Sequence, residues 1–509
     1  MKPLKSISAL ISLLCSAQLY CQIEVDSALF RVMDEVVISA TRTEKKSQDV
    51  AVPTIILSGK EVQLSGYTEL NQILAEQSGI VITEGHGSGI QIQGFDPEYT
   101  MILIDGDPMI GRTAGVLDLD RINLRNVARI EIVKGAASCL YGSEAMGGAV
   151  NIITKSPAEE LDLRAFAAMG SPSFYELGLN ASGKNGALGW SLFADYQHAA
   201  GFDLNDSLNG VNLGRSRKLN LQAKGYFNLG DYDFKPALRF YRDNLPGDFY
   251  QNTSTQEPFY SKALTEEISG VLPMSKTWNK GIKTTAKLYA SYFRTASSAG
   301  IVGSSENATD VSASNFKQQL IMPEFTVEIP KSGALHYLFG VGGRIENVSA
   351  ERYAENRALI TQYAFGQMQF RPIEDLELTG GIRADHVNLY GSRLSPKLSA
   401  IYQWKNKINL KGSLGYGFKT PDFRQLYLDF TNQAIGYSVV GSEIAADRIN
   451  QLQASGVIAE VLPDLANVNA LQAEISQSIN LGLVYFISQD HSLEINFFHN
   501  KISNLINSV

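Results

Sequence analysis

The chain has 509 residues, of which 44% are hydrophobic and 19% are charged, and its formal net charge is -8. A protein that binds nucleic acid concentrates lysine and arginine to neutralise phosphates, and the sequence has no such cluster, so nucleic acid is excluded as a partner. The length suggests about three ordinary domains of ~150 residues, although one large β-barrel also accommodates it.

The N-terminus has the pattern of an export signal. Lys2 and Lys5 precede a mostly apolar run at residues 7–19. A run of this length fits the hydrophobic region of a signal peptide and is too short to cross a bilayer as a helix. We expect residues 1–21 to be removed on export, and lipid attachment at a leader cysteine is the alternative.

A membrane location would require β-strands. No later segment offers about 18 consecutive apolar residues, so no transmembrane helix is expected. A closed barrel is the other structure that satisfies its backbone hydrogen bonds in lipid. Only Cys139 lies beyond the leader, so the mature chain is expected to have no disulfide.

The region before residue 156 predicts a small mixed α+β unit. Short apolar strands are expected at residues 52–57, 79–83, 101–104, 130–133 and 150–153, with a helix-like stretch at 67–77. We place this unit, with its own hydrophobic core, at residues 50–156.

From residue 160 to 509 the sequence consists largely of segments with alternating polarity. One of them sets an apolar face against a polar one, namely Leu376, Leu378, Gly380, Ile382 and Ala384 against Glu377, Thr379, Arg383 and Asp385. About fourteen or fifteen candidate strands follow one another, many of 10 residues or more, whereas globular strands average about 5 to 6. A soluble β-sandwich also alternates, but the number and length of these strands favour a transmembrane β-barrel in contact with lipid.

The connections between these strands are unequal, as expected for a barrel with short turns at one end and long loops at the other. Long connections are expected at residues 201–216, 246–258, 296–314 and 430–477, the last with a helix-like stretch at 449–465. Closely spaced oxygen ligands in the first loop make a weak calcium candidate of Asp203, Asn205 and Asp206. A hydrophilic loop without metal is the plainer interpretation.

Two stretches of the α+β unit carry a family resemblance. Residues 129–135 read RIEIVKG and residues 140–154 read LYGSEAMGGAVNIIT. With ILIDG at residues 102–106, they resemble the end of the plug domain of TonB-dependent outer-membrane receptors. The motif residues are Arg129, Glu131, Lys134, Gly135, Tyr141, Gly142, Gly147 and Gly148. Glycines here permit the tight turns and close approach that a domain wedged inside a barrel requires.

The segment before the plug also resembles a family feature. Residues 34–40 read DEVVISA and are similar to the TonB box, a flexible extended segment offered to a periplasmic energy-coupling protein. Such a segment can add as a strand to a partner sheet. The resemblance assigns coupling to a TonB-type protein to Asp34, Glu35, Val36, Val37, Ile38 and Ser39. An ordinary buried strand is the other interpretation.

The barrel region departs from the family in two respects. Residues 417–427 and 469–474 resemble two family boxes, but Lys419 and Thr420 stand where Arg and Ala are usual, and no His lies between the boxes. Family barrels have 22 strands, whereas about fifteen are expected here, and the chain ends without the usual aromatic residue. We therefore expect a mainly β fold, an α+β plug inside a large antiparallel barrel that is incomplete at its C-terminus.

In the family, outward plug loops and the inner barrel wall form the substrate site. The corresponding apices are residues 84–89 and 109–113, which give as candidate contacts His86, Ser88, Met109, Arg112 and Thr113. Arg112 could pair with a carboxylate, phosphate or siderophore anion, and His86 could ligate haem iron. A bridge from Arg112 to the barrel and a solvated His86 are the plainer interpretations.

The resemblance implies active import across the outer membrane of an iron–siderophore, haem or cobalamin, driven by a TonB-type protein in the periplasm. No catalytic arrangement is evident, because the histidines are scattered over alternating strands, and neither enzymatic activity nor a cofactor is expected. The alternatives are an enzyme in an outer-membrane barrel, a passive porin or adhesion barrel, and a non-functional receptor fragment. A porin would lack the plug and residues 34–40.

Overall fold

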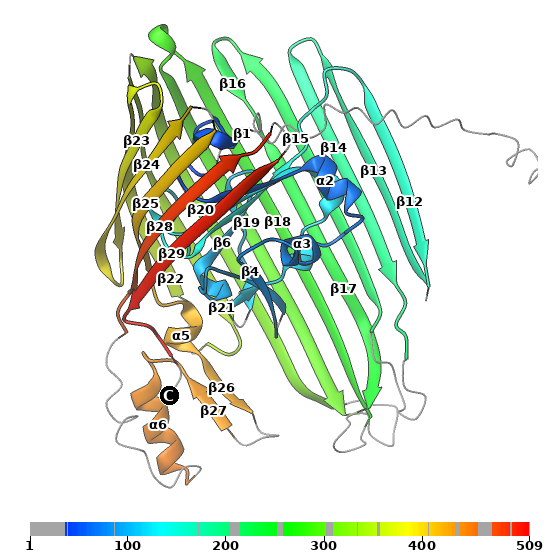
Figure 1. Cartoon of the computed structure of the whole chain (residues 1–509). Helices are drawn as coiled ribbons and strands as arrows, with labels where there is room; N and C mark the ends of the chain where they lie inside the picture. The colour runs from blue at the N-terminus through cyan, green and yellow to red at the C-terminus, as the bar shows by residue number, and fades with distance from the viewer. Residues whose placement is uncertain are drawn as a thin grey trace, which may run out of the picture.

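The protein consists of a small α+β plug partly enclosed by one large antiparallel sheet (Figure 1). The computed structural model describes residues 36–507, except 38, 86, 114, 172, 204–213, 252–257, 302–308, 333, 354–356, 406, 433–436, 457–470 and 489–490. The plug, coloured blue and cyan in Figure 1, lies against the inner face of the curved sheet.

The plug is built on five strands in the spatial order β3-β10-β11-β6-β7. β11 runs parallel to β6, and the other neighbours are antiparallel. The strands are β3 (Thr54–Ser58), β6 (Thr100–Ile104), β7 (Asp107–Pro108), β10 (Val127–Lys134) and β11 (Gly148–Thr154). Each strand expected from the sequence in this region overlaps an observed strand, including β4 (Ile80–Gly85).

Short helices and hairpins surround this sheet. The helices are α2 (Gly59–Leu64), α3 (Leu70–Ala75) and α4 (Ser138–Tyr141), and the hairpins pair β1 (Val36–Val37) with β2 (Lys45–Lys46), β4 with β5 (Gly87–Ile92), and β8 (Arg112–Thr113) with β9 (Val116–Leu117). The helix expected at 67–77 is shorter than predicted, and α2 was not predicted. Its signal is a capping box, in which Ser58 and Glu61 satisfy each other's backbone N–H groups.

The large sheet contains 16 antiparallel strands in hairpin order, with β12 and β29 at its two edges. β16 and β17 share one position between β15 and β18, so the expectation of about fifteen strands is confirmed. The strands are β12 (Asp162–Gly170), β13 (Phe174–Asn185), β14 (Leu188–Ala199), β15 (Ser216–Leu229), β16 (Tyr232–Phe234), β17 (Ala237–Gln251), β18 (Pro258–Thr277), β19 (Lys283–Ile301), β20 (Thr309–Ser332), β21 (Leu335–Ala350), β22 (Arg357–Ile373), β23 (Leu376–Val387), β24 (Gly391–Trp404), β25 (Ile408–Lys419), β28 (Glu474–Phe486) and β29 (Ser492–Ser503).

Side chains on this sheet are arranged inversely to those of a soluble protein. On β24, Leu394 and Leu398 are 65% and 59% exposed, whereas Ser395 and Lys397 between them are buried. Because successive residues of a strand face opposite sides, the apolar face points outward and the polar face points to the plug. An outer apolar face suits lipid and an inner polar face suits a polar filling.

The two ends of the sheet differ in their connections. Short turns such as residues 374–375 join the strands at one end, while the long connections gather at the other, together with α5 (Phe423–Tyr427), β26 (Asp429–Asn432), β27 (Tyr437–Val440) and α6 (Ala445–Ala454) (Figure 1). In a barrel of this kind the short turns are periplasmic and the long loops are extracellular.

Three of the expected long connections differ from the structure. β17 continues to Gln251 and β19 to Ile301, so the connections at 246–258 and 296–314 are shorter than predicted because paired strands extend into them. The helix expected at 449–465 begins four residues earlier and its C-cap is Ser455. No helix among the described residues is long and apolar enough to cross a membrane.

Candidate functional site

Ser39 is the point at which the segment ahead of the plug is fixed to the plug sheet. Its backbone N–H and its hydroxyl donate to Glu131 Oε2 at 2.8 and 2.5 Å. Asn151 donates to the Ser39 hydroxyl at 2.7 Å, and the Tyr141 hydroxyl donates to the Ser39 carbonyl at 3.0 Å. Ser39, Glu131 and Asn151 are all buried, so these bonds are protected from water.

The plug motif supplies most of this binding site. Glu131 on β10 is itself oriented by Arg129, whose Nε lies 2.7 Å from Glu131 Oε1. Tyr141 ends α4, which begins four residues after β10. Glu131, Arg129 and Tyr141 were predicted only as family markers, and the structure brings them together with Ser39 of the predicted coupling segment.

The coupling segment differs in conformation from the prediction. Val36 and Val37 form the short strand β1, which pairs with β2 of the same chain. Ser39 lies in a turn and is buried, whereas an exposed extended segment was expected through residue 40. The expectation fails here because hydrogen bonds to distant plug residues outweigh local sequence pattern. Asp34, Glu35 and Ile38 lie outside the described residues.

The residues that follow Ser39 are fixed to the barrel. Arg42 forms a two-pronged ion pair with Glu324 on β20, with N–O distances of 2.6 and 3.0 Å. Its guanidinium also lies 5.1 Å from the ring centre of Phe365. Lys45 forms an ion pair with Glu377 on β23. Residues 39–45 therefore connect the plug to two separate parts of the inner barrel wall.

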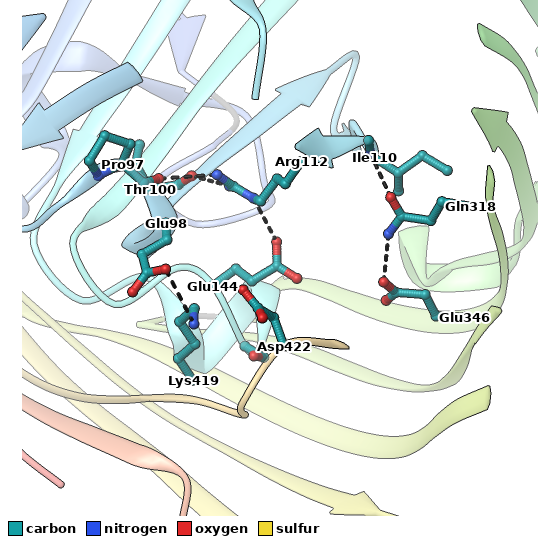
Figure 2. Close-up of polar contacts among 12 residues, drawn as sticks. Pro97, Glu98, Thr100, Ile110, Arg112, Glu144, Gln318, Glu346, Lys419 and Asp422 are labelled. Atoms are coloured by element: carbon teal, nitrogen blue, oxygen red, sulfur yellow. Dashed lines mark hydrogen bonds and ion pairs between the residues drawn. The ribbon is translucent and has the colours of Figure 1, made fainter. Parts of the chain in front are cut away.

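Arg112 lies on the plug face that is turned toward the extracellular loops. It donates to the carbonyls of Pro97 and Thr100 at 3.1 and 2.6 Å, and its Nε is 3.4 Å from Glu144 (Figure 2). All three of these contacts lie within the plug, so Arg112 makes no direct bridge to the barrel among them. Arg112 reaches the barrel through Glu144 instead.

Glu144 joins the outward plug face to the barrel wall. Arg344 on β21 donates to Glu144 at 3.1 Å and to Glu346 at 2.8 Å. Burial acts to raise the pKa of Glu144, but Arg344 and Arg112 outweigh it and hold that pKa below its usual range. Glu144 is therefore a carboxylate at neutral pH and a charged bridge between plug and barrel.

A parallel connection runs from the neighbouring plug turn. The backbone N–H of Gly111 donates to Gln318 on β20 at 2.7 Å, and Gln318 donates to Glu346 at 2.6 Å (Figure 2). Glu346 thus receives contacts that begin at both Gly111 and Arg112. The two routes converge on one buried carboxylate of the barrel.

Lys419, the last residue of β25, contacts the same plug face near Glu98. Its ammonium group is 3.9 Å from Glu98 and 3.8 Å from Glu474, and it is only 3% exposed (Figure 2). Arg424 lies 3.7 Å from the same Glu98 oxygen. We call Glu98, Arg112, Glu144, Lys419, Asp422 and Arg424 the charged floor.

The other predicted substrate contacts have different surroundings. Met109 is 5% exposed and belongs to the plug core, so its prediction as a ligand contact is not supported by its position. Ser88 is partly buried and accepts a bond from Asn71 at 3.3 Å, and Thr113 is partly buried in the β8–β9 hairpin. His86 lies outside the described residues.

The remaining motif residues shape the plug sheet. Gly148 has a φ of +143°, and a Cβ there would lie 2.3 Å from the Val133 carbonyl oxygen. Gly135 has a φ of +88° and lies against Asn480 of the barrel. Lys134 donates to the Ser78 carbonyl at 2.6 Å, and burial lowers the pKa of its ammonium group. Gly142 lies against the side chain of Arg383, and Gly147 lies against that of Phe95.

A cavity of about 60 Å³ lies between the contacts of the coupling segment and the charged floor. Arg42, Glu324 and Tyr141 line it on the coupling side, and Glu144 and Arg344 on the floor side. Charged groups of plug and barrel thus face one internal space. A cavity of this size and polarity accommodates water that could replace ion pairs when they separate.

The calcium candidate gains no support among the described residues. Asn205 and Asp206 lie outside them, and within them no group of three or more His, Cys, Asp or Glu side chains is placed to hold a metal. The contacts that sequence reasoning missed are those of Glu98, Glu144, Arg344 and Glu346. Only the position of Glu144 within the plug motif offered a signal.

Comparison with known proteins identifies both parts of the chain. The family described as TonB dependent receptor-like, beta-barrel, matches residues 162–509. The TonB-dependent Receptor Plug Domain matches residues 46–149. The barrel match alone covers more than half of the chain.

Several relatives are similar over most of this chain. The vitamin B12 transporter BtuB of Photobacterium profundum is 24% identical over 82% of this chain and 70% of its own length. BtuB of Vibrio cholerae serotype O1 is 25% identical over 77% of this chain and 64% of its own length. The chain thus spans about two thirds of these curated relatives.

Solved structures show the same fold. The siderophore receptor PirA of Acinetobacter baumannii has a TM-score of 0.67 and 18% identity, covering 89% of this chain and 71% of that one. The alcaligin receptor FauA of Bordetella pertussis has a TM-score of 0.67 and 15% identity, covering 93% and 75%. With the family matches, these findings lead to one conclusion. The chain belongs to the TonB-dependent receptors, non-enzymatic transport proteins that reside in the bacterial outer membrane.

Proposed function

We propose that this protein imports a scarce nutrient across the outer membrane and that residues 34–39 couple the import to a TonB-type protein in the periplasm. The observation that carries the proposal is the attachment of Ser39 to Glu131 and Tyr141 of the plug. A pull on residues 34–39 would act first on Ser39, and through it on the centre of the plug sheet.

The contact network supports a link between ligand binding and this coupling. A ligand on the charged floor would act on Arg112 and Glu144, which connect through Arg344 to the barrel wall. Arg42 and Glu324 face the same internal cavity from the coupling side. Movement of Glu144 would therefore change the electrostatic environment of the Arg42–Glu324 pair.

We infer that a bulky ligand with little net charge, such as a cobalamin, is the first candidate substrate. The charged floor contains three cations and three carboxylates, so it offers no excess positive charge to a strongly anionic ligand. The BtuB relatives are named as vitamin B12 transporters. Iron–siderophores remain the second candidate, because the similar solved structures include siderophore receptors, and haem is the third.

The proposal divides the chain into functional parts. Residues 1–21 serve as the export signal, 34–40 as the coupling segment, 50–156 as the plug, and 160–509 as the barrel. His86, Ser88, Arg112 and Thr113 remain candidate substrate contacts, and Arg112 gains most support because it belongs to the charged floor.

The test compares binding and uptake in cells that produce the full chain. Radiolabelled cyanocobalamin, ferric enterobactin and haemin are supplied to the wild type, to a deletion of residues 34–40, and to a variant with those residues scrambled. We expect one ligand to bind to all three proteins and to be taken up only by the wild type. Uptake that survives in the deletion variant would refute the coupling role.

A further inference from the structure

A row of charged side chains crosses the outer wall of the barrel near its long-loop end. Arg242 on β17 pairs in register with Glu266 on β18, Glu266 with Arg294 on β19, and Arg294 with Lys317 on β20. We call these four residues the basic row. Their side chains share one face of the sheet because they occupy opposite positions on adjacent strands.

The basic row faces outward, away from the plug. The residues next to it in sequence are Tyr241, Glu267, Phe293 and Gln318, and all four are buried on the inner side. Since successive residues alternate between faces, the row must point to the surroundings of the barrel. Arg242 and Lys317 are accordingly exposed.

The outward residues of the neighbouring rows indicate where the basic row lies relative to the lipid. Two residues further from the long-loop end, Phe240, Ile268, Tyr292 and Gln319 form the next outward row. Beyond it lie Leu238, Gly270, Ala290 and Ile321, and then the exposed Leu272 and Leu288. Each step is about 7 Å. The outward side chains thus change from apolar, through a row that contains Phe240 and Tyr292, to charged, as expected at the boundary between hydrocarbon and head groups.

The row has an excess of unpaired positive charge. Glu266 is its single carboxylate, and its one ion pair, to Arg242, is long at 3.7 Å. Within the described part of the chain, Arg294 and Lys317 form no ion pair, and Arg294 Nε is buried without a hydrogen-bond partner. Arg217, another exposed cation, stands one row further out on β15 opposite Asn244.

We propose that the basic row binds the phosphate groups of a lipid head group in the outer leaflet, with Arg242, Arg294 and Lys317 as the binding residues. Guanidinium and ammonium groups are strong donors to phosphate oxygens. The three cations lie on β17, β19 and β20, three of four adjacent strands. With strands about 4.8 Å apart they span about 14 Å. A single monovalent anion would neutralise only one of the three cations. A lipid with two phosphates carries enough negative charge, over a comparable distance, to pair with all three.

The described outward residues near the long-loop ends of β22, β23 and β24 include no comparable row of cations. On β22, β23 and β24, the outward residues Gln362, His386 and Ser392 pair in register, and His386 is hydrogen-bonded to Ser392 at 3.1 Å. Gln362 and Ser392 are uncharged side chains. The cations of the basic row therefore have no counterpart among the described residues of these three strands, which favours β17–β20 as the lipid site.

The test measures lipid binding to the full chain purified in mild detergent. Native mass spectrometry follows titration with diphosphoryl lipid A and with the same lipid after removal of both phosphates. The test variant combines Arg242→Gln, Arg294→Gln and Lys317→Gln. The control combines Lys184→Gln, Lys283→Gln and Lys405→Gln, which remove the same charge from exposed positions at the short-turn end.

We expect the test variant to bind the diphosphoryl lipid about 100-fold more weakly than the wild type. The control should bind normally, and the dephosphorylated lipid should bind all proteins equally and weakly. Restoring charge with Arg242→Lys and Arg294→Lys beside the native Lys317 should recover most of the affinity. Equal affinity of wild type and test variant, or equal loss in the control, would overturn the site.

Discussion

Glu131 receives both the backbone N–H and the hydroxyl of Ser39 on one carboxylate oxygen, at 2.8 and 2.5 Å. The two residues are 92 positions apart and both are buried. This contact holds the end of the coupling segment against β10, an inner strand of the plug sheet. It makes the attachment of that segment a property of the folded plug.

The first prediction concerns Ser39→Ala. The substitution removes the hydroxyl that donates to Glu131 and accepts from Asn151, so the buried Asn151 amide loses its bond to Ser39 and Glu131 loses one of its donors. Each such loss costs about 1–3 kcal/mol, so opening of residues 36–46 should increase about tenfold or more. Hydrogen exchange followed by mass spectrometry measures this opening. Ser65→Ala, which removes a local bond to Val62, serves as control, and equal exchange in both variants would contradict the role of Ser39.

The second prediction concerns the Arg42–Glu324 pair. Both side chains are largely buried, so Glu324→Gln leaves the Arg42 charge without its carboxylate and should lower stability by about 3–5 kcal/mol. Arg42→Met should cost less, because Glu324 keeps the hydroxyl of Tyr363 at 2.9 Å and the ammonium group of Lys287 at 3.9 Å. The double variant should lose clearly less than the sum of the two. Denaturant unfolding of the four proteins in detergent measures the coupling free energy. Strict additivity would show that the pair does not act as a unit.

The third prediction concerns pH and Glu144. Its folded-state pKa is lowered, so the charged carboxylate stabilises the folded plug above the unfolded pKa, and this contribution is lost as the pH falls through the folded pKa. Glu144→Gln should therefore lower the thermal midpoint at about pH 7 and have little effect at about pH 2. Thermal unfolding of both proteins across this range provides the measurement. A difference that stays constant with pH would exclude the charge as its cause.

The fourth prediction separates backbone strain from close approach. Gly148 and Gly66 both have positive φ, but only at Gly148 would a Cβ meet another atom, the Val133 carbonyl oxygen at 2.3 Å. Gly66→Ala should destabilise the plug by about 1 kcal/mol. Gly148→Ala should be far more damaging, because β10 and β11 must separate. Limited proteolysis of the plug compares the two variants, and equal resistance would contradict the close approach.

Period-two alternation predicted the barrel well because it depends on a physical requirement that acts on every strand. Leu394 and Lys397 differ in exposure because one faces out and the other faces the plug, and the sequence pattern records that difference directly. The total number of strands followed from the same pattern. Strand ends were less predictable, since Gln251 and Ile301 are held in strands by pairing partners rather than by their own polarity.

The contacts of the candidate site could be predicted only in part. Glu131 and Tyr141 stood out by family resemblance, but nothing local indicates that they bind Ser39. Ser39 and Glu131 are far apart along the chain and meet only because the plug folds. Glu144 and Arg344 meet because the plug fits into the barrel. Met109 was misjudged because its apolar side chain turns into the plug core from a turn expected to be exposed.

The inward polar face of the barrel has a consequence for how the plug can move. Lys224 and Lys287 form ion pairs with Asp105 and Asp107 of the plug at 3.0 and 2.7 Å. The barrel interior therefore offers the plug surface polar partners, as water does. When such a contact opens and water enters, one polar bond is exchanged for another at a small net free energy. An apolar wall would resist separation, whereas this wall lets a plug that is stably lodged be displaced by a modest force.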